Sequence, residues 1–128
     1  LAGAGIMGNK YLFKNVSDEH NIATRLALLE KHAEYDPARI IKEFKGGCYV
    51  YESSPFSYMF FVRNPHSIEC MYDCASYGGD TDTNASMVGG LLGALHGTKI
   101  FPDHLVEGLR DRETIMLVAD KFYKRLTK

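Results

Sequence analysis

The densest group of oxygen-bearing side chains in this 128-residue chain lies in residues 78–84, which read Gly-Gly-Asp-Thr-Asp-Thr-Asn. Asp80 and Asp82 alternate with Thr81 and Thr83, so an extended turn would bring carboxylates and hydroxyls to one side. Hard cations such as Mg²⁺, Mn²⁺ and Ca²⁺ prefer these oxygen ligands. A helix starting just after the run would favour ionised aspartates through its positive N-terminal end. The run therefore predicts a divalent-metal site.

Three other interpretations of this run are weaker. A helix N-cap needs one Asp, Thr or Asn, whereas here five such residues follow one another. An EF-hand loop requires Gly at its sixth position and Glu at its twelfth, where this chain has Ala85 and Leu91. Phosphatases with an aspartate nucleophile carry a D-x-D-x-T/V run directly after a strand. Here Asn84 ends the run and a helical pattern precedes it.

Two further motifs carry less information. Residues 3–8 match the G-x-G-x-x-G pattern, but a dinucleotide-binding motif needs a hydrophobic strand before it, and only Leu1 and Ala2 precede it here. Cys70 and Cys74 are four residues apart, which is a helical spacing. Because no second pair of ligands lies nearby, we predict buried thiols there rather than a zinc site.

The composition is that of an ordinary globular domain, with 45% hydrophobic and 24% charged residues and a net charge of −1. Nothing in this charge indicates a nucleic-acid or membrane partner, and no apolar run reaches the roughly eighteen residues of a membrane span. Three cysteines are too few for a disulfide framework, so we expect an intracellular, cytoplasmic protein. The chain begins at Leu1 without methionine, and we expect a fragment of a longer one.

Helical patterns place residues 78–84 within an all-α fold. The predicted helices share apolar residues at helical spacing together with capping residues, prolines or glycines at their ends, over residues 17–29, 36–44, 54–62, 67–77, 85–96, 103–109 and 111–126. The helix that begins at Ser54-Pro55 is expected to be central, because residues 56–62 offer no polar face. Composition alone would also allow a buried strand there.

The helix expected over residues 85–96 contains three interior glycines, and each costs about 1 kcal/mol relative to alanine. Ala85, Gly89, Gly93 and Gly97 fall four apart and form a smooth stripe. Such a stripe lets another helix or a ligand approach the backbone closely, which we expect to offset the cost. His96 is expected to cap the last carbonyls of this helix.

These residues resemble the C-terminal signature of the ADP-ribosylglycohydrolases, a family that includes the dinitrogenase-reductase-activating glycohydrolases and a crystallin. The resemblance rests on Gly78 to Thr83, the small-residue run over 85–97, and Ile100-Phe101-Pro102 with Leu109 beyond it. Residues 52–55 before an apolar helix are also similar to the segment that precedes the signature. The resemblance covers roughly Gly47 to Leu126.

The resemblance implies a compact all-α domain with a pair of Mg²⁺ or Mn²⁺ ions in a cleft, and Asp80, Asp82 and Thr83 as metal ligands. It implies hydrolysis of the glycosidic bond that joins ADP-ribose to a protein side chain or to another ADP-ribose. The expected partner is therefore ADP-ribose or an ADP-ribosylated protein, which we expect Gly78 and Gly79 to contact. No catalytic residue is assigned.

The chain departs from the family pattern in three respects. It lacks the Thr/Ser-Asp-Asp run and the catalytic acid of the family's N-terminal half, and it has no tryptophan after the glycine run. Its length is about half that of the family domain. We therefore expect residues 1–128 to be the C-terminal portion of a single domain. Alone, it should bind metal weakly and leave ADP-ribosyl bonds intact. The other half, or a homodimer, would complete it.

Two alternatives stay open. The chain could be a non-catalytic member of the family that binds ADP-ribose or serves a structural role, as a crystallin does. It could also be a stand-alone metal-binding helical domain, in which Glu52, Asp73 or a symmetry-related chain supplies the second set of ligands.

Overall fold

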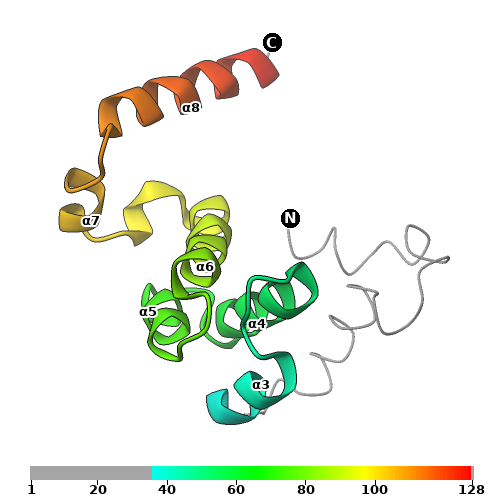
Figure 1. Ribbon diagram of the computed structural model, residues 1–128. Helices are drawn as coiled ribbons and strands as arrows, with labels where there is room; N and C mark the ends of the chain where they lie inside the picture. Colours follow the sequence, from blue (N-terminus) through cyan, green and yellow to red (C-terminus); the bar gives the residue numbers. More distant parts are fainter. Residues whose placement is uncertain (1–35, 128) are drawn as a thin grey trace, which may run out of the picture.

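The computed structural model describes residues 36–127, and every regular element in that range is helical (Figure 1). The elements are α3 (Pro37–Phe44), α4 (Val50–Arg63), α5 (Glu69–Ser76), α6 (Thr81–His96), the 3₁₀ helix η2 (Gly97–Ile100), α7 (Asp103–Glu107) and α8 (Arg112–Leu126). The all-α prediction is confirmed. The helix predicted over residues 17–29 and the glycine motif of residues 3–8 lie outside the described residues.

Helix α3 begins and ends as its sequence predicts. The backbone N–H of Arg39 donates to the side chain of Asp36 at 2.8 Å, and Pro37 fills the first helical position, where a missing N–H costs nothing. The helix ends at Phe44. Its C-cap residue Lys45 has a left-handed φ of 62°, and Gly46 follows with the same φ. The chain thereby turns sharply towards α4.

Helix α4 begins at Val50, so the predicted start at Ser54-Pro55 is wrong by a full turn. The Tyr49 carbonyl already accepts the N–H groups of Glu52 and Ser53, at 2.8 and 2.9 Å. Pro55 therefore lies inside the helix, where it costs about 3 kcal/mol because it cannot donate a helical hydrogen bond. Pro55 and Phe56 are both fully buried, and their packing outweighs this local cost.

The core forms where α4 packs against α3, α5 and α6 (Figure 1). It contains Phe44, Phe56, Met59, Phe60, Cys70, Cys74, Val88 and Leu92. Each buried large apolar side chain contributes about 1.5–3 kcal/mol relative to an exposed one. The prediction that the apolar helix is central is confirmed, and Cys70 and Cys74 are buried thiols as predicted.

The link between α5 and α6 carries the run singled out in the sequence. The Ser67 hydroxyl accepts the N–H of Glu69 at 3.2 Å, but the N-cap residue of α5 is Ile68, so the predicted cap lies one residue too early. Helix α5 ends at Ser76, and Gly78 and Gly79 then take left-handed φ values of 87° and 76°. These two glycines turn the chain into α6.

The small-residue stripe of α6 is covered by two side chains. A Cβ added to Gly89 would lie 3.4 Å from the sulfur of Met71, and one added to Gly93 would lie 3.6 Å from the ring of Phe101. The stripe therefore accommodates α5 and the segment after η2, and no ligand is needed to explain it. The predicted capping role of His96 is wrong, because its Nε2–H donates to the carbonyl of Pro65 at 2.7 Å.

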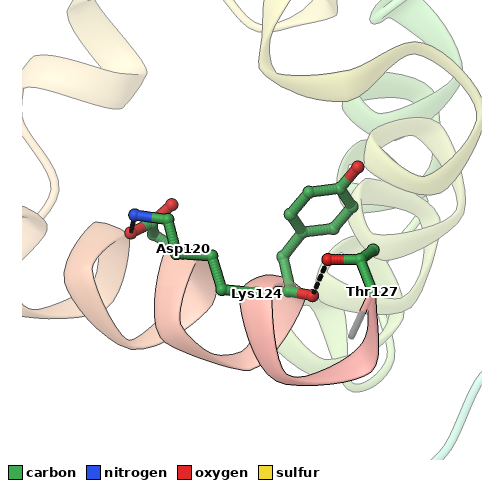
Figure 2. Close-up of polar contacts among 4 residues, drawn as sticks. Asp120, Lys124 and Thr127 are labelled. Carbon is green, nitrogen blue, oxygen red and sulfur yellow. Dashed lines mark hydrogen bonds and ion pairs between the residues drawn. The ribbon is translucent and has the colours of Figure 1, made fainter.

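Helix α8 stands apart from the α3–α6 core (Figure 1). It has no buried residue, and its large apolar side chains are between 46% and 68% exposed: Ile115, Met116, Leu117, Val118, Phe122, Tyr123 and Leu126. Along its polar side, Lys124 pairs with Asp120 at 2.6 Å, and the Thr127 hydroxyl donates to the Tyr123 carbonyl at 3.0 Å (Figure 2). Between residues 36 and 127, no helix is long and apolar enough to cross a membrane.

A candidate metal centre at the start of helix α6

The oxygen-rich run forms the first turn of α6. Asp80 is the N-cap residue, Thr81 begins the helix, and Asp82 and Thr83 follow it. The expected extended turn is therefore wrong for three of the four residues, because the helix begins earlier than predicted. Asp80 makes no side-chain capping hydrogen bond to this helix.

Hydrogen bonds from neighbouring side chains lower the pKa of Asp80 below its usual range. The largest cause is the Asp82 carboxyl group, followed by the Cys48 thiol and the Thr83 hydroxyl. Asp80 is consequently ionised at neutral pH. Asp82 in turn accepts the backbone N–H of Thr83 at 2.9 Å. Asp80, Asp82 and Thr83 therefore lie within one turn at the start of α6, and their role as metal ligands stays a prediction.

Cys48 is part of this cluster, although nothing in the sequence singled it out. Its thiol is exposed, and its pKa is raised first by the hydrogen bond to Asp80 and then by the negative charge of Asp80. The thiol is therefore protonated at pH 7. Cys48 reaches Asp80 because the loop between α3 and α4 lies against the start of α6.

A single carbonyl joins that loop to α6. The Gly46 carbonyl oxygen accepts the backbone N–H of Asp80 at 2.9 Å and the side-chain amide of Asn84 at 2.8 Å. A Cβ on Gly79 would overlap this same oxygen, so only glycine permits the contact. Gly78 differs, since a Cβ added there would meet nothing within 4 Å.

Asn84 is fully buried at the centre of this contact. Its carbonyl oxygen accepts the Ser57 hydroxyl of α4 at 3.3 Å, while its amide donates to Gly46. The sequence did contain a signal for it, because Asn84, Val88 and Leu92 fall four apart on the core face of α6. A polar side chain on such a face must find buried hydrogen-bond partners.

The cluster suits a hard cation through its donor types and supplies only part of a coordination shell. Asp80, Asp82 and Thr83 offer oxygen donors, whereas Mg²⁺ requires six ligands in octahedral geometry. Over residues 36–127, no group of three or more His, Cys, Asp or Glu side chains could hold a metal ion. The residues present fit one side of a site.

The two further carboxylates considered as ligands lie in different places. The Glu52 carboxylate approaches Gly47, where an added Cβ would lie 2.6 Å from its oxygen, so Glu52 borders the loop that carries Cys48. Asp73 is exposed on α5, where its charge adds to burial in raising the pKa of Cys70. Of the two, Glu52 is the one beside a segment of the cluster.

Comparison with known proteins agrees with the resemblance drawn from the motif. The family model described as ADP-ribosylglycohydrolase matches residues 7–128, which extends well before the segment that carried the resemblance. No curated protein and no solved structure matches the chain. The structure agrees with this match. The fold is all-α, and the aspartate and threonine cluster lies at the start of the glycine-rich helix α6. The chain belongs to the ADP-ribosylglycohydrolase family.

Proposed function

We propose that this chain provides one side of a divalent-metal site that hydrolyses the glycosidic bond between ADP-ribose and a protein side chain or another ADP-ribose. The observation that carries the proposal is the gathering of Asp80, Asp82 and Thr83 at the start of α6, with Asp80 ionised. Membership of a glycohydrolase family supports the type of reaction. Mg²⁺ or Mn²⁺ suits these ligands, and a complete site would hold two ions.

Each residue of the cluster has a distinct role in this proposal. Asp80 and Asp82 supply negative charge and carboxylate oxygens, and Thr83 supplies a hydroxyl oxygen. Gly78 and Gly79 lie beside them, and the open space at Gly78 leaves room for substrate. When bound, the metal ion neutralises the carboxylates, polarises a substrate oxygen and orients water. The general acid or base is supplied from outside the described residues.

The exposed apolar side of α8 supports completion of the site by more protein. Its large side chains are at least 46% exposed, which is unusual for so many neighbouring apolar groups. We propose that another part of the family domain, or a second copy of this chain, covers them. Light scattering after gel filtration would separate a dimer from a monomer. The free thiols of Cys48, Cys70 and Cys74 favour an intracellular, cytoplasmic setting.

Thermal melting tests the ligand assignment. A Mn²⁺ concentration ten times the Kd would stabilise the folded chain by about 1.4 kcal/mol. In a domain of this size, that raises the Tm by about 6 °C. Asp80→Ala and Asp82→Ala should each abolish the rise. Asp103→Ala, at the exposed start of α7, is the matched control and should keep it. A rise that survives in both variants of the cluster removes the assignment.

A second candidate is a non-catalytic member that binds ADP-ribose or serves a structural role. The observation in its favour is that residues 36–127 hold too few acidic ligands for a complete site. ADP-ribose that raises the Tm, with no release of ADP-ribose from a modified protein by the full-length protein, would support this candidate. Release of ADP-ribose that depends on Asp80 would exclude it.

A further inference from the structure

Asn84 makes hydrogen bonds to two different segments from the first turns of α6. Its side-chain amide donates to the Gly46 carbonyl at 2.8 Å, and its oxygen accepts the Ser57 hydroxyl at 3.3 Å. Its backbone N–H donates to the carbonyl of Asp80 at 3.0 Å. Because a carbonyl can only accept, the Gly46 bond fixes which end of the Asn84 amide points to the loop.

The bond to Gly46 does more than satisfy a buried amide. The same oxygen accepts the N–H of Asp80, so Asn84 and Asp80 both hold the loop through one acceptor. The position of the loop therefore fixes the backbone of Asp80, from which its carboxylate projects.

The two hydrogen bonds of the Asn84 side chain differ in strength. The bond to Gly46 has the ideal length for an amide donor, whereas 3.3 Å is long for a hydroxyl donor. Removing the Ser57 hydroxyl would leave the loop attached. Removing the Asn84 amide would leave the Asp80 N–H as the one remaining donor of the pair to the Gly46 carbonyl. This difference separates a positioning role from a purely structural one.

We propose that Asn84 is the positioning residue of the metal centre: it clamps the Gly46–Cys48 loop onto the start of α6 and so orients Asp80. This inference rests on the proposed function, since it assumes that Asp80 is a metal ligand. Residues that orient a metal ligand through hydrogen bonds contribute about 10–100-fold to metal affinity.

The test measures Mn²⁺ affinity by the electron paramagnetic resonance signal of free Mn²⁺, which requires no catalytic activity. Asn84→Ala should weaken binding about 10-fold. Ser57→Ala is the matched control, because it also removes one buried hydrogen bond of Asn84, and it should stay within about twofold of wild type. Hydrogen exchange should show faster exchange of the Asp80 amide in Asn84→Ala than in Ser57→Ala.

A second variant covers the case in which Asn84→Ala fails to fold. Gly79→Ala pushes the Gly46 carbonyl away while leaving Asn84 intact, and it should weaken Mn²⁺ binding similarly. Equal affinities of Asn84→Ala and Ser57→Ala would overturn the inference, as would wild-type affinity in a folded Gly79→Ala. If wild type bound no Mn²⁺, or if Asp80→Ala kept its affinity, the proposed function would fall and the inference with it.

Discussion

Adjacent glycines in the α5–α6 link provide a sharp test of the contact between Gly79 and Gly46. Both Gly78 and Gly79 have left-handed φ values, so alanine at either position adds backbone strain of about 1–2 kcal/mol. Their surroundings differ completely. A Cβ at Gly78 meets nothing within 4 Å, whereas a Cβ at Gly79 overlaps the Gly46 carbonyl oxygen. The pair therefore separates backbone strain from loss of the contact.

The structure sets the size of the difference. Moving the Gly46 carbonyl breaks its hydrogen bonds from Asp80 and Asn84, and each is worth about 1 kcal/mol net. Gly79→Ala should thus lower the free energy of unfolding by about 3–4 kcal/mol, against about 1–2 kcal/mol for Gly78→Ala.

Urea denaturation followed by circular dichroism measures both variants. With a slope of about 2 kcal/mol per molar urea, the two midpoints should differ by about 1 M. Equal midpoints would refute the reasoning, because they would mean that the Gly46 carbonyl contributes nothing to holding the loop on α6. A larger loss in Gly78→Ala would refute it as well.

Two further predictions concern α6 and the core. Gly90→Ala should raise the free energy of unfolding by about 1 kcal/mol in the same urea assay, because an added Cβ meets nothing and alanine forms helix better than glycine. Burial raises the pKa of the Cys74 thiol to about 12, so as pH rises the unfolded chain releases this proton at a lower pH than the folded chain does. Stability should therefore be complete below the ordinary thiol pKa and fall between about pH 9 and 12. Cys74→Ala should flatten that fall, and an unchanged pH profile would contradict the assignment.

The sequence predicted most of the helical fold because the residues that start and end helices act locally. Asp36-Pro37 starts α3, and the pair Gly78-Gly79 turns the chain after α5, as the sequence predicts. The predicted start of α4 at Pro55 was wrong for the opposite reason. Local rules assign proline to a helix start, but burial between neighbouring helices kept it inside α4. Only contacts between segments distant in sequence could reveal that.

The same distinction applies to the candidate site. Asp80, Asp82 and Thr83 could be proposed as ligands from the sequence because carboxylates and hydroxyls alternate there at close spacing. Cys48 lies more than thirty residues earlier, and no local pattern links it to Asp80. Likewise, His96 reaches the Pro65 carbonyl across the fold, so its position at a helix end predicted the wrong partner.

The Gly46 carbonyl explains why stability and the candidate site are linked here. One oxygen accepts hydrogen bonds from Asp80 and Asn84, and Gly46 itself lies against the ring of Phe56 in the core. A change in core packing at Phe56 would therefore move the acceptor that positions Asp80. Variants of Phe56 should lose Mn²⁺ affinity together with stability, whereas variants of Leu92, on a deeper turn of α6, should lose stability alone. Such a split would indicate that the loop between α3 and α4, rather than the aspartate run by itself, determines the geometry of the site.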